Sequence, residues 1–222
     1  MKHTRSVLIW LCFLPGLLVL AAAQSPPPPQ AGQRKSELVE LNVLDPTLKL
    51  DIRYATSNNF VGRPVYKQAR AFLQRPAAEA LVRVNKAIAK QGLGLLIFDG
   101  YRPWYVTKIF WEVTPDDKRE FVADPAKGSR HNRGCAVDLT LYDLKTELPV
   151  KMPSEFDEMT ERSHPDYKCA TPEAQKSRDL LRAAMEAEGF KVYENEWWHF
   201  DYKDWNLYPI LDISFSAIDR VQ

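Results

Sequence analysis

The sequence predicts an α+β fold with a central antiparallel sheet and flanking helices. Helix-like and strand-like apolar patterns both occur, they do not alternate as regular βαβ units, and no internal repeat is visible. The chain has 222 residues, of which 45% are hydrophobic, enough for one domain with a sizeable core. Its 30 Lys and Arg residues against 29 Asp and Glu residues give no support to nucleic-acid binding through a large basic surface.

The first 23 residues resemble a cleavable secretion signal. Lys2 and Arg5 form a basic start without acidic residues, Val7–Leu20 is apolar, and Ala21–Ala23 offers small residues for cleavage. A membrane anchor is the alternative, but a Pro-Gly pair interrupts the apolar stretch, which is short for a bilayer-spanning helix. We therefore expect a signal peptide over residues 1–23, export to the periplasm or the cell exterior, and no stable membrane span after cleavage.

A Pro-rich segment follows the predicted signal. Residues 24–37 contain four consecutive prolines, which favour an extended polyproline II conformation, and we expect them to act as a linker. The domain itself is predicted over residues 38–222. Because the signal holds two basic and no acidic residues, its removal changes the formal net charge from +1 to about −1.

The first half of the domain combines extended segments with one clear helix. Leu38–Leu44 and Leu48–Tyr54 both show strand-like alternation on either side of the turn-prone Asp45, which predicts two strands or extended arms. Ala77–Lys90 has apolar residues at helical spacing and ends at a Gln-Gly pair, which predicts a helix. The short apolar run Leu93–Phe98 is typical of a buried strand.

The second half repeats this mixture. A helix is predicted through Trp104–Trp111, and another over Thr171–Glu188 with Thr171 as its N-cap. Gly134–Tyr142 alternates as a strand, which places Asp138 on the face opposite its apolar neighbours. Phe190–Tyr202 is expected to return as a strand or the edge of a hairpin.

The domain contains the residue types that zinc hydrolysis needs. Such a site takes three His or carboxylate ligands, an open position for water, and a carboxylate that accepts the proton of the water. His131 lies in a polar loop seven residues before Asp138, and His199 lies in a strand-like aromatic segment. Glu196, three residues before His199, is the candidate general base. Strict strand alternation would place the two residues on opposite faces, so Glu196 must lie at a bend where the strand begins. Glu194 remains a competitor.

The motifs around these residues resemble a known family. The patterns Ser129-x-His131-x-x-Gly134-x-Ala136-x-Asp138 and Glu196-x-x-His199 are similar to the paired signature of the D-alanyl-D-alanine dipeptidases of VanX type. These enzymes belong to the zinc D,D-dipeptidase and D,D-carboxypeptidase family, peptidase family M15. Four more segments are similar to that branch, in the same order: Arg53–Gly62, Asp99–Pro103, Phe156-Asp157 and Glu161–His164.

The resemblance covers roughly residues 38–210 and implies a Hedgehog/D,D-peptidase-like zinc peptidase domain. By this resemblance His131, Asp138 and His199 hold one Zn²⁺ per subunit, and Glu196 is the catalytic acid and base. Arg102 is implied to stabilise the oxyanion that develops on the peptide carbonyl, a role that suits a fixed guanidinium.

The substrate implied is the dipeptide D-alanyl-D-alanine, a small zwitterion that is hydrolysed to two D-alanine molecules. In the related family the Phe-Asp position contributes to the amino end, so we expect Asp157 to bind the ammonium group and Ser129 to hydrogen-bond the substrate. A D,D-carboxypeptidase or endopeptidase acting on peptidoglycan stem peptides is the alternative within the same chemistry. A non-catalytic, zinc-stabilised cell-wall binding module is the alternative of another class.

Two cysteines remain after signal cleavage. Cys135 and Cys169 are candidates for a disulfide in an exported protein, and the alternative is two buried free thiols. Cys135 is also where the family commonly has a small residue such as Ser. A thiol ligand to zinc is disfavoured, because strand alternation points Cys135 away from Asp138.

Overall fold

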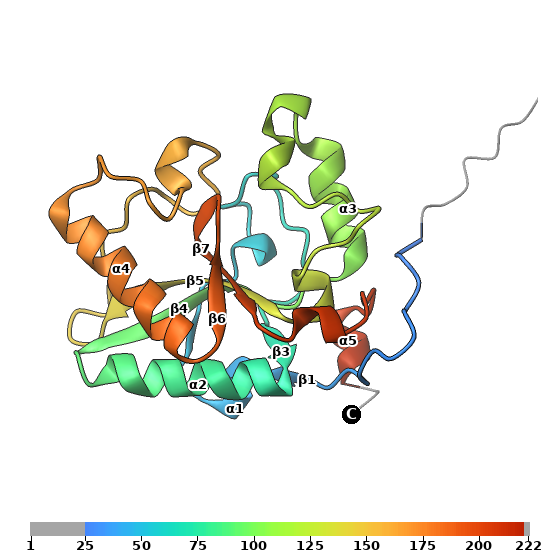
Figure 1. Ribbon diagram of the computed structural model, residues 1–222, viewed down its shortest axis with the longest axis horizontal. Coiled ribbons are helices and arrows are strands. Elements are labelled where there is room, and N and C mark those ends of the chain that lie inside the picture. The colour runs from blue at the N-terminus through green and yellow to red at the C-terminus, as the bar shows by residue number, and fades with distance from the viewer. Residues whose placement is uncertain (1–24, 220–222) are drawn as a thin grey trace, which may run out of the picture.

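The computed structural model describes residues 25–219, so the predicted signal peptide lies outside the described residues. A five-stranded sheet with strand order β2-β4-β5-β7-β6 forms the centre, and a separate two-stranded sheet joins β1 to β3 (Figure 1). The strands are β1 (Leu38–Glu40), β2 (Lys49–Leu50), β3 (Phe72–Gln74), β4 (Leu93–Asp99), β5 (Ala136–Asp143), β6 (Phe190–Tyr193) and β7 (Glu196–Tyr202).

The helices divide between the two faces of the large sheet. The α-helices are α1 (Leu41–Leu44), α2 (Arg75–Ala89), α3 (Trp104–Val113), α4 (Pro172–Ala187) and α5 (Phe215–Ile218). The 3₁₀ helices are η1 (Arg53–Ala55), η2 (Asp116–Phe121), η3 (His131–Arg133), η4 (Glu161–Ser163) and η5 (Trp205–Leu207). Helices α2 and α4 pack against each other and against the sheet, while α3 lies toward the opposite side (Figure 1).

The predicted α+β fold is confirmed, with one difference in the sheet. Strands β4, β5, β7 and β6 pair antiparallel in that order, as expected, whereas β2 pairs with β4 in parallel. The helices predicted from Ala77, Trp104 and Thr171 are present as α2, α3 and α4. Thr171 caps α4 as predicted, because its hydroxyl accepts a hydrogen bond from the backbone N–H of Ala174 at 3.3 Å.

The strand predicted over Leu38–Leu44 is wrong after Glu40. The chain continues as the single helical turn α1, in which Leu41 is buried and Val43 is 73% exposed. The apolar alternation therefore does not mark a buried sheet face beyond Glu40. The second predicted strand is likewise short: β2 covers two residues and is followed by η1.

The two faces of the large sheet carry different contents. One face packs against α2 and α4 in the main core, to which β4 and β5 contribute Leu95, Ile97, Val137, Leu139 and Leu141. The other face carries a small apolar cluster of Leu96, Phe98 and Tyr142, packed against Phe156. Asp138 and Thr140 alternate with the core residues of β5, as predicted, so polar groups are left on the second face.

A row of polar residues crosses three neighbouring strands on this second face. Asp138 of β5 lies directly opposite His199 of β7, and on its other side it pairs with Asp99 of β4. A register shift between Ile97 and Asp99 interrupts the regular alternation of β4 at this point. The sheet thereby gathers three titratable side chains at one place.

The end of the predicted linker is attached to the domain. The backbone N–H of Arg34 donates to the carbonyl of Leu207 at 2.7 Å, and its guanidinium lies 3.0 Å from Asp204. Within residues 25–219, no helix is both long enough and apolar enough to cross a bilayer.

Candidate metal centre

His131 is oriented by the short helix in which it lies. Helix η3 ends at Gly134, whose positive φ of 68° allows its N–H to donate to the carbonyl of His131 at 3.0 Å. The ring nitrogen Nδ1 lies 2.7 Å from the carbonyl oxygen of Gly100, which can only accept, so Nδ1 carries the proton. The other nitrogen, Nε2, is therefore left with a lone pair.

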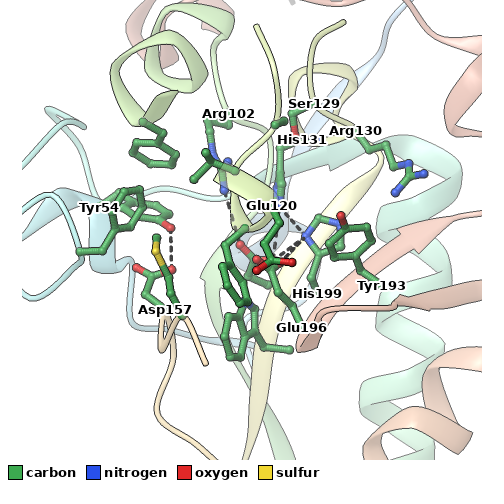
Figure 2. Close-up of a pocket in the computed structure, with 18 of the residues that line it drawn as sticks. Tyr54, Arg102, Glu120, Ser129, Arg130, His131, Asp157, Tyr193, Glu196 and His199 are labelled. Carbon is green, nitrogen blue, oxygen red and sulfur yellow. Dashed lines mark hydrogen bonds and ion pairs between the residues drawn. The ribbon is translucent and has the colours of Figure 1, made fainter. Parts of the chain in front are cut away.

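The lone pair of His131 points at Asp138 and His199. Nε2 of His131 lies 3.3 Å from Asp138 Oδ1 and 3.0 Å from His199 Nδ1, and these last two atoms are 3.0 Å apart. All three side chains are buried. The structure thus brings together the three residues that the sequence predicts as metal ligands. Figure 2 labels two of them, His131 and His199.

The geometry of the three atoms fits a zinc ion. Zinc bonds to nitrogen and oxygen are about 2.0–2.1 Å, so ligand atoms at the corners of a tetrahedron are about 3.3–3.4 Å apart, close to the separations here. Asp138 Oδ1 is buried and has no hydrogen-bond partner among the described residues, although both imidazole nitrogens lie within 3.3 Å. Three such groups facing one point suit a cation, which each of them can bind through a lone pair.

The electrostatics of His199 agree with this interpretation. Burial alone would lower the pKa of this imidazole, but the carboxylates of Asp201 and Asp138 outweigh burial and raise it to about 10. The same two carboxylates also favour a metal cation at this point.

Glu196 lies beside the three candidate ligands. It is the first residue of β7, and the pairing of β6 with β7 is irregular next to its partner Tyr193, as the predicted bend requires. Its Oε2 is 3.7 Å from His199 Nδ1. Burial raises the pKa of Glu196 to about 8. Glu194, the competing candidate, is exposed in the turn before β7 and is not among the described residues that line the cavity.

Arg102 is held rigidly on the other side of Asp138. Its Nη2 lies 2.9 Å from Asp99 Oδ2 and 3.6 Å from Asp138 Oδ2, and the guanidinium carbon is 4.6 Å from the ring centre of Phe110. The side chain is buried, and burial of a charge is costly. The two carboxylates and the aromatic ring offset this cost.

Asp157 enters the same cavity from the loop that follows β5. Its Oδ1 accepts a hydrogen bond from the hydroxyl of Tyr54 at 2.9 Å, while its Oδ2 is buried without a partner among the described residues. Burial raises the pKa of this carboxyl to about 7. The backbone φ of Asp157 is +62°, a left-handed conformation that is costly for a non-glycine residue.

These groups line one cavity of about 450 Å³. Figure 2 shows Asp157 and Tyr54 on one side of the cavity, Tyr193 and Arg130 on the opposite side, and the two histidines between them. Ser129 also lines it, next to His131, whose backbone N–H lies 3.2 Å from the Ser129 hydroxyl oxygen. Every predicted site residue except the two cysteines therefore faces this cavity: Arg102, Ser129, His131, Asp138, Asp157, Glu196 and His199.

Comparison with known families assigns the chain. Residues 34–216 match the sequence model of a peptidase M15 family described as D-Ala-D-Ala dipeptidase. The chain belongs to this family. A D-alanyl-D-alanine dipeptidase from Escherichia coli (strain K12) is 40% identical over 182 residues, which cover 82% of this chain and 93% of the relative. Another from Enterococcus faecium is 38% identical over 175 residues, covering 71% of this chain and 87% of the relative.

More distant likeness is found among solved structures. The vancomycin resistance D,D-dipeptidase VanXYg, in complex with a D-Ala-D-Ala phosphinate analog, is 21% identical, with a TM-score of 0.40 over 64% of this chain and 52% of that chain. The family membership of the chain does not depend on this similarity.

Two groups that contact the candidate ligands are not found by sequence reasoning. Asp201 lies 3.0 Å from the Nε2 of His199, and the carbonyl of Gly100 holds His131. Asp201 follows His199 by two positions in β7, a spacing that shares one strand face, so alternation contains a signal for it. The contact of Gly100 uses a backbone atom and leaves no side-chain signal.

The suggested disulfide does not form in the structure. Cys135 and Cys169 are both free, the first buried and the second exposed. The thiol of Cys135 lies in the main core, 3.6 Å from the carbonyl oxygen of Arg133, whereas Cys169 lies in the turn before α4. The alternative of two buried thiols holds for Cys135 alone. Burial raises the pKa of this thiol, which makes it unreactive.

Proposed function

We propose that the protein hydrolyses D-alanyl-D-alanine to two D-alanine molecules with one zinc ion per subunit. The observation that carries the proposal is the convergence of His131 Nε2, Asp138 Oδ1 and His199 Nδ1 within 3.3 Å of one another, with Glu196 alongside. Relatives of the same family that are named for this activity support the choice of substrate.

Each group at the site has a separate role in the proposed hydrolysis. A zinc ion bound by His131, Asp138 and His199 would supply the Lewis acidity that activates water at neutral pH. Glu196 accepts the proton that the attacking water releases and then delivers it to the leaving amine, and a pKa near 8 suits both steps. The immobile guanidinium of Arg102 stabilises the negative charge that develops on the carbonyl oxygen.

The ends of the cavity suit a free dipeptide. The buried Oδ2 of Asp157 has no partner among the described residues, and an ammonium group would supply both the missing donor and the opposite charge. Ser129 lies on the cavity wall beside His131 and offers a hydroxyl to the substrate. Together these contacts support a small zwitterion over a longer peptide.

The alternatives differ in what the cavity must admit. A D,D-carboxypeptidase or endopeptidase acting on peptidoglycan stems needs room for further residues beyond the amino end, where Asp157 lies. A non-catalytic cell-wall binding module has no need for Glu196 and Arg102 beside the three candidate ligands, so the first alternative is the stronger competitor.

We also propose that the protein is exported. Residues 1–23 carry the pattern of a secretion signal, and an exported enzyme meets dipeptides outside the cytoplasm. Scavenging of D-alanyl-D-alanine released during cell-wall turnover is the role that fits this location. Fractionation that finds the protein in the cytosol with Met1 retained would contradict the proposal.

One assay tests the proposed activity. The protein is incubated with D-alanyl-D-alanine and with a pentapeptide that ends in D-alanyl-D-alanine, and released D-alanine is measured. We expect release from the dipeptide alone, its loss with a chelator, and its recovery on addition of zinc. Preferred release from the pentapeptide would favour the carboxypeptidase, and binding without any release would favour the non-catalytic module.

A further inference from the structure

The candidate ligand His199 has a second contact on the side facing away from the other two ligands. Its Nε2 lies 3.0 Å from Asp201 Oδ1, and both side chains are almost fully buried. The two residues are two positions apart in β7 and therefore lie on one face of the strand. The imidazole is held between Asp138 at one nitrogen and Asp201 at the other.

Asp201 also forms an ion pair with Arg130. Its second carboxylate oxygen, Oδ2, lies 2.8 Å from Nη1 of Arg130. The guanidinium of Arg130 rests over the ring of Trp205 at 4.8 Å and near that of Tyr193 at 5.8 Å. One oxygen of the Asp201 carboxylate therefore contacts Arg130, and the other contacts His199.

This arrangement determines which imidazole nitrogen faces the cluster. A carboxylate accepts hydrogen bonds, so Nε2 of His199 carries a proton where it faces Asp201, and Nδ1 is the nitrogen whose lone pair is available to a metal ion beside His131 and Asp138. His131 is held by the neutral carbonyl of Gly100, whereas His199 is held by a charged group, which also makes the imidazole a stronger donor to a metal ion.

We propose that Asp201, anchored by Arg130, is a positioning residue that fixes His199 for zinc binding through Nδ1. The inference rests on the proposed zinc site and assigns a role to two residues outside the ligand set. It predicts that the affinity for zinc depends on a carboxylate that does not contact the metal.

Zinc affinity, measured by competition with a chromophoric chelator, tests the proposal without an activity assay. We expect Asp201→Ala to weaken zinc binding about 10–100-fold, and the isosteric Asp201→Asn, which keeps an acceptor but loses the charge, to weaken it about 3–10-fold. Asp204→Asn is the matched control, because Asp204 also pairs with an arginine, Arg34, but does not contact His199. It should change zinc affinity less than about twofold.

The role of Arg130 is tested in two backgrounds. Arg130→Ala alone should weaken zinc binding, by less than Asp201→Ala does, whereas in the Asp201→Ala background it should have no further effect, since it acts through that carboxylate. Thermal unfolding in excess chelator shows whether each variant folds; if Asp201→Ala does not, Asp201→Asn alone decides the result.

Two results would overturn the inference: Asp201→Asn and Asp201→Ala binding zinc as tightly as the unchanged protein, or Arg130→Ala acting equally in both backgrounds. Failure of the zinc site itself has a different signature. In that case His199→Ala would retain the metal, whereas a wrong inference about Asp201 leaves His199→Ala zinc-free and the Asp201 variants loaded.

Discussion

At the scale of single residues, the cavity combines two carboxyl groups that burial makes less acidic with one that stays ionised. The pKa is raised to about 8 for Glu196 and about 7 for Asp157, whereas Asp138 is held ionised because His131 and His199 outweigh the effect of burial. The ionised Asp138 is one of the candidate ligands. Glu196 lies where a proton would be transferred, and Asp157 lies where the ammonium group of the substrate would bind.

Glu196→Gln tests the role in proton transfer. Gln keeps the shape of the side chain but cannot accept a proton, so turnover of D-alanyl-D-alanine should fall by about 10²–10⁴-fold. Zinc content should stay at one ion per subunit, since Glu196 is not among the three converging ligands. Steady-state kinetics together with metal analysis checks this, and Glu194→Gln in the exposed turn is the control. A Glu196→Gln protein with normal turnover would refute the role.

Asp157→Asn tests the recognition of the amino end. The amide keeps an acceptor for the Tyr54 hydroxyl but removes the charge, so kcat/KM for the dipeptide should fall by about 10–100-fold, the loss of a charge-assisted hydrogen bond. Glu155→Gln, an exposed neighbour in the same loop, should leave the kinetics unchanged. N-acetylated dipeptide gives the complementary result: it should be a poor substrate for the unchanged protein, and equal rates on both substrates would contradict the assignment.

At the scale of elements, the short helix η3 connects the candidate ligand His131 to the core. Gly134 ends this helix at a positive φ, and a side chain there would meet Leu38 Cδ2 of β1 at 2.5 Å. The chain needs glycine at this point both for the conformation and for the close approach of the two segments.

Gly134→Ala separates these two effects when it is compared with Gly62→Ala. Both glycines have positive φ, but a side chain at Gly62 meets nothing within 4 Å. We expect Gly62→Ala to cost about 1 kcal/mol of unfolding free energy and Gly134→Ala about 2 kcal/mol or more, because Leu38 must also move. Urea unfolding measures both. Equal costs would show that the contact with Leu38 adds nothing.

The elements also show what sequence reasoning can and cannot predict. Helices α2 and α4 follow from long amphipathic patterns with clear ends, because their apolar stripes are what packs on the sheet. The alternating pattern of Leu38–Leu44 predicts a strand where a helical turn forms after Glu40. Alternation of apolar residues does not show whether a partner strand is present to bury them. The parallel pairing of β2 with β4 depends on a contact between segments more than 40 residues apart, for which local periodicity has no signal.

The site residues divide in the same way. His131, Asp138 and His199 are predicted as ligands from the resemblance of their motifs to a known family, because such a motif records which side chains meet at one site. The register that places Asp138 opposite His199 is a property of the assembled sheet, and so are the contacts of Tyr54 with Asp157 and of Asp201 with His199. Such partners become visible only when distant segments are brought together.

At the scale of the whole molecule, the three candidate ligands come from η3, β5 and β7, which meet only in the folded chain. Helices α2 and α4 cover one face of the sheet, so the opposite face is left for the polar row that crosses β4, β5 and β7. Because an unfolded chain cannot present the three groups together, zinc should bind the folded state almost exclusively, and binding then contributes directly to stability.

Zinc should therefore raise the thermal stability of the protein. At free zinc about 100-fold above the dissociation constant, the stabilisation is about 2.7 kcal/mol, which for a domain of this size corresponds to a rise in Tm of roughly 5–10 °C over the chelated protein. Thermal unfolding followed by circular dichroism, with zinc and with chelator, measures this. His199→Ala is the control and should show no zinc-dependent shift, since the cluster then lacks one ligand. An equal Tm with and without zinc in the unchanged protein would contradict a site assembled from these three segments.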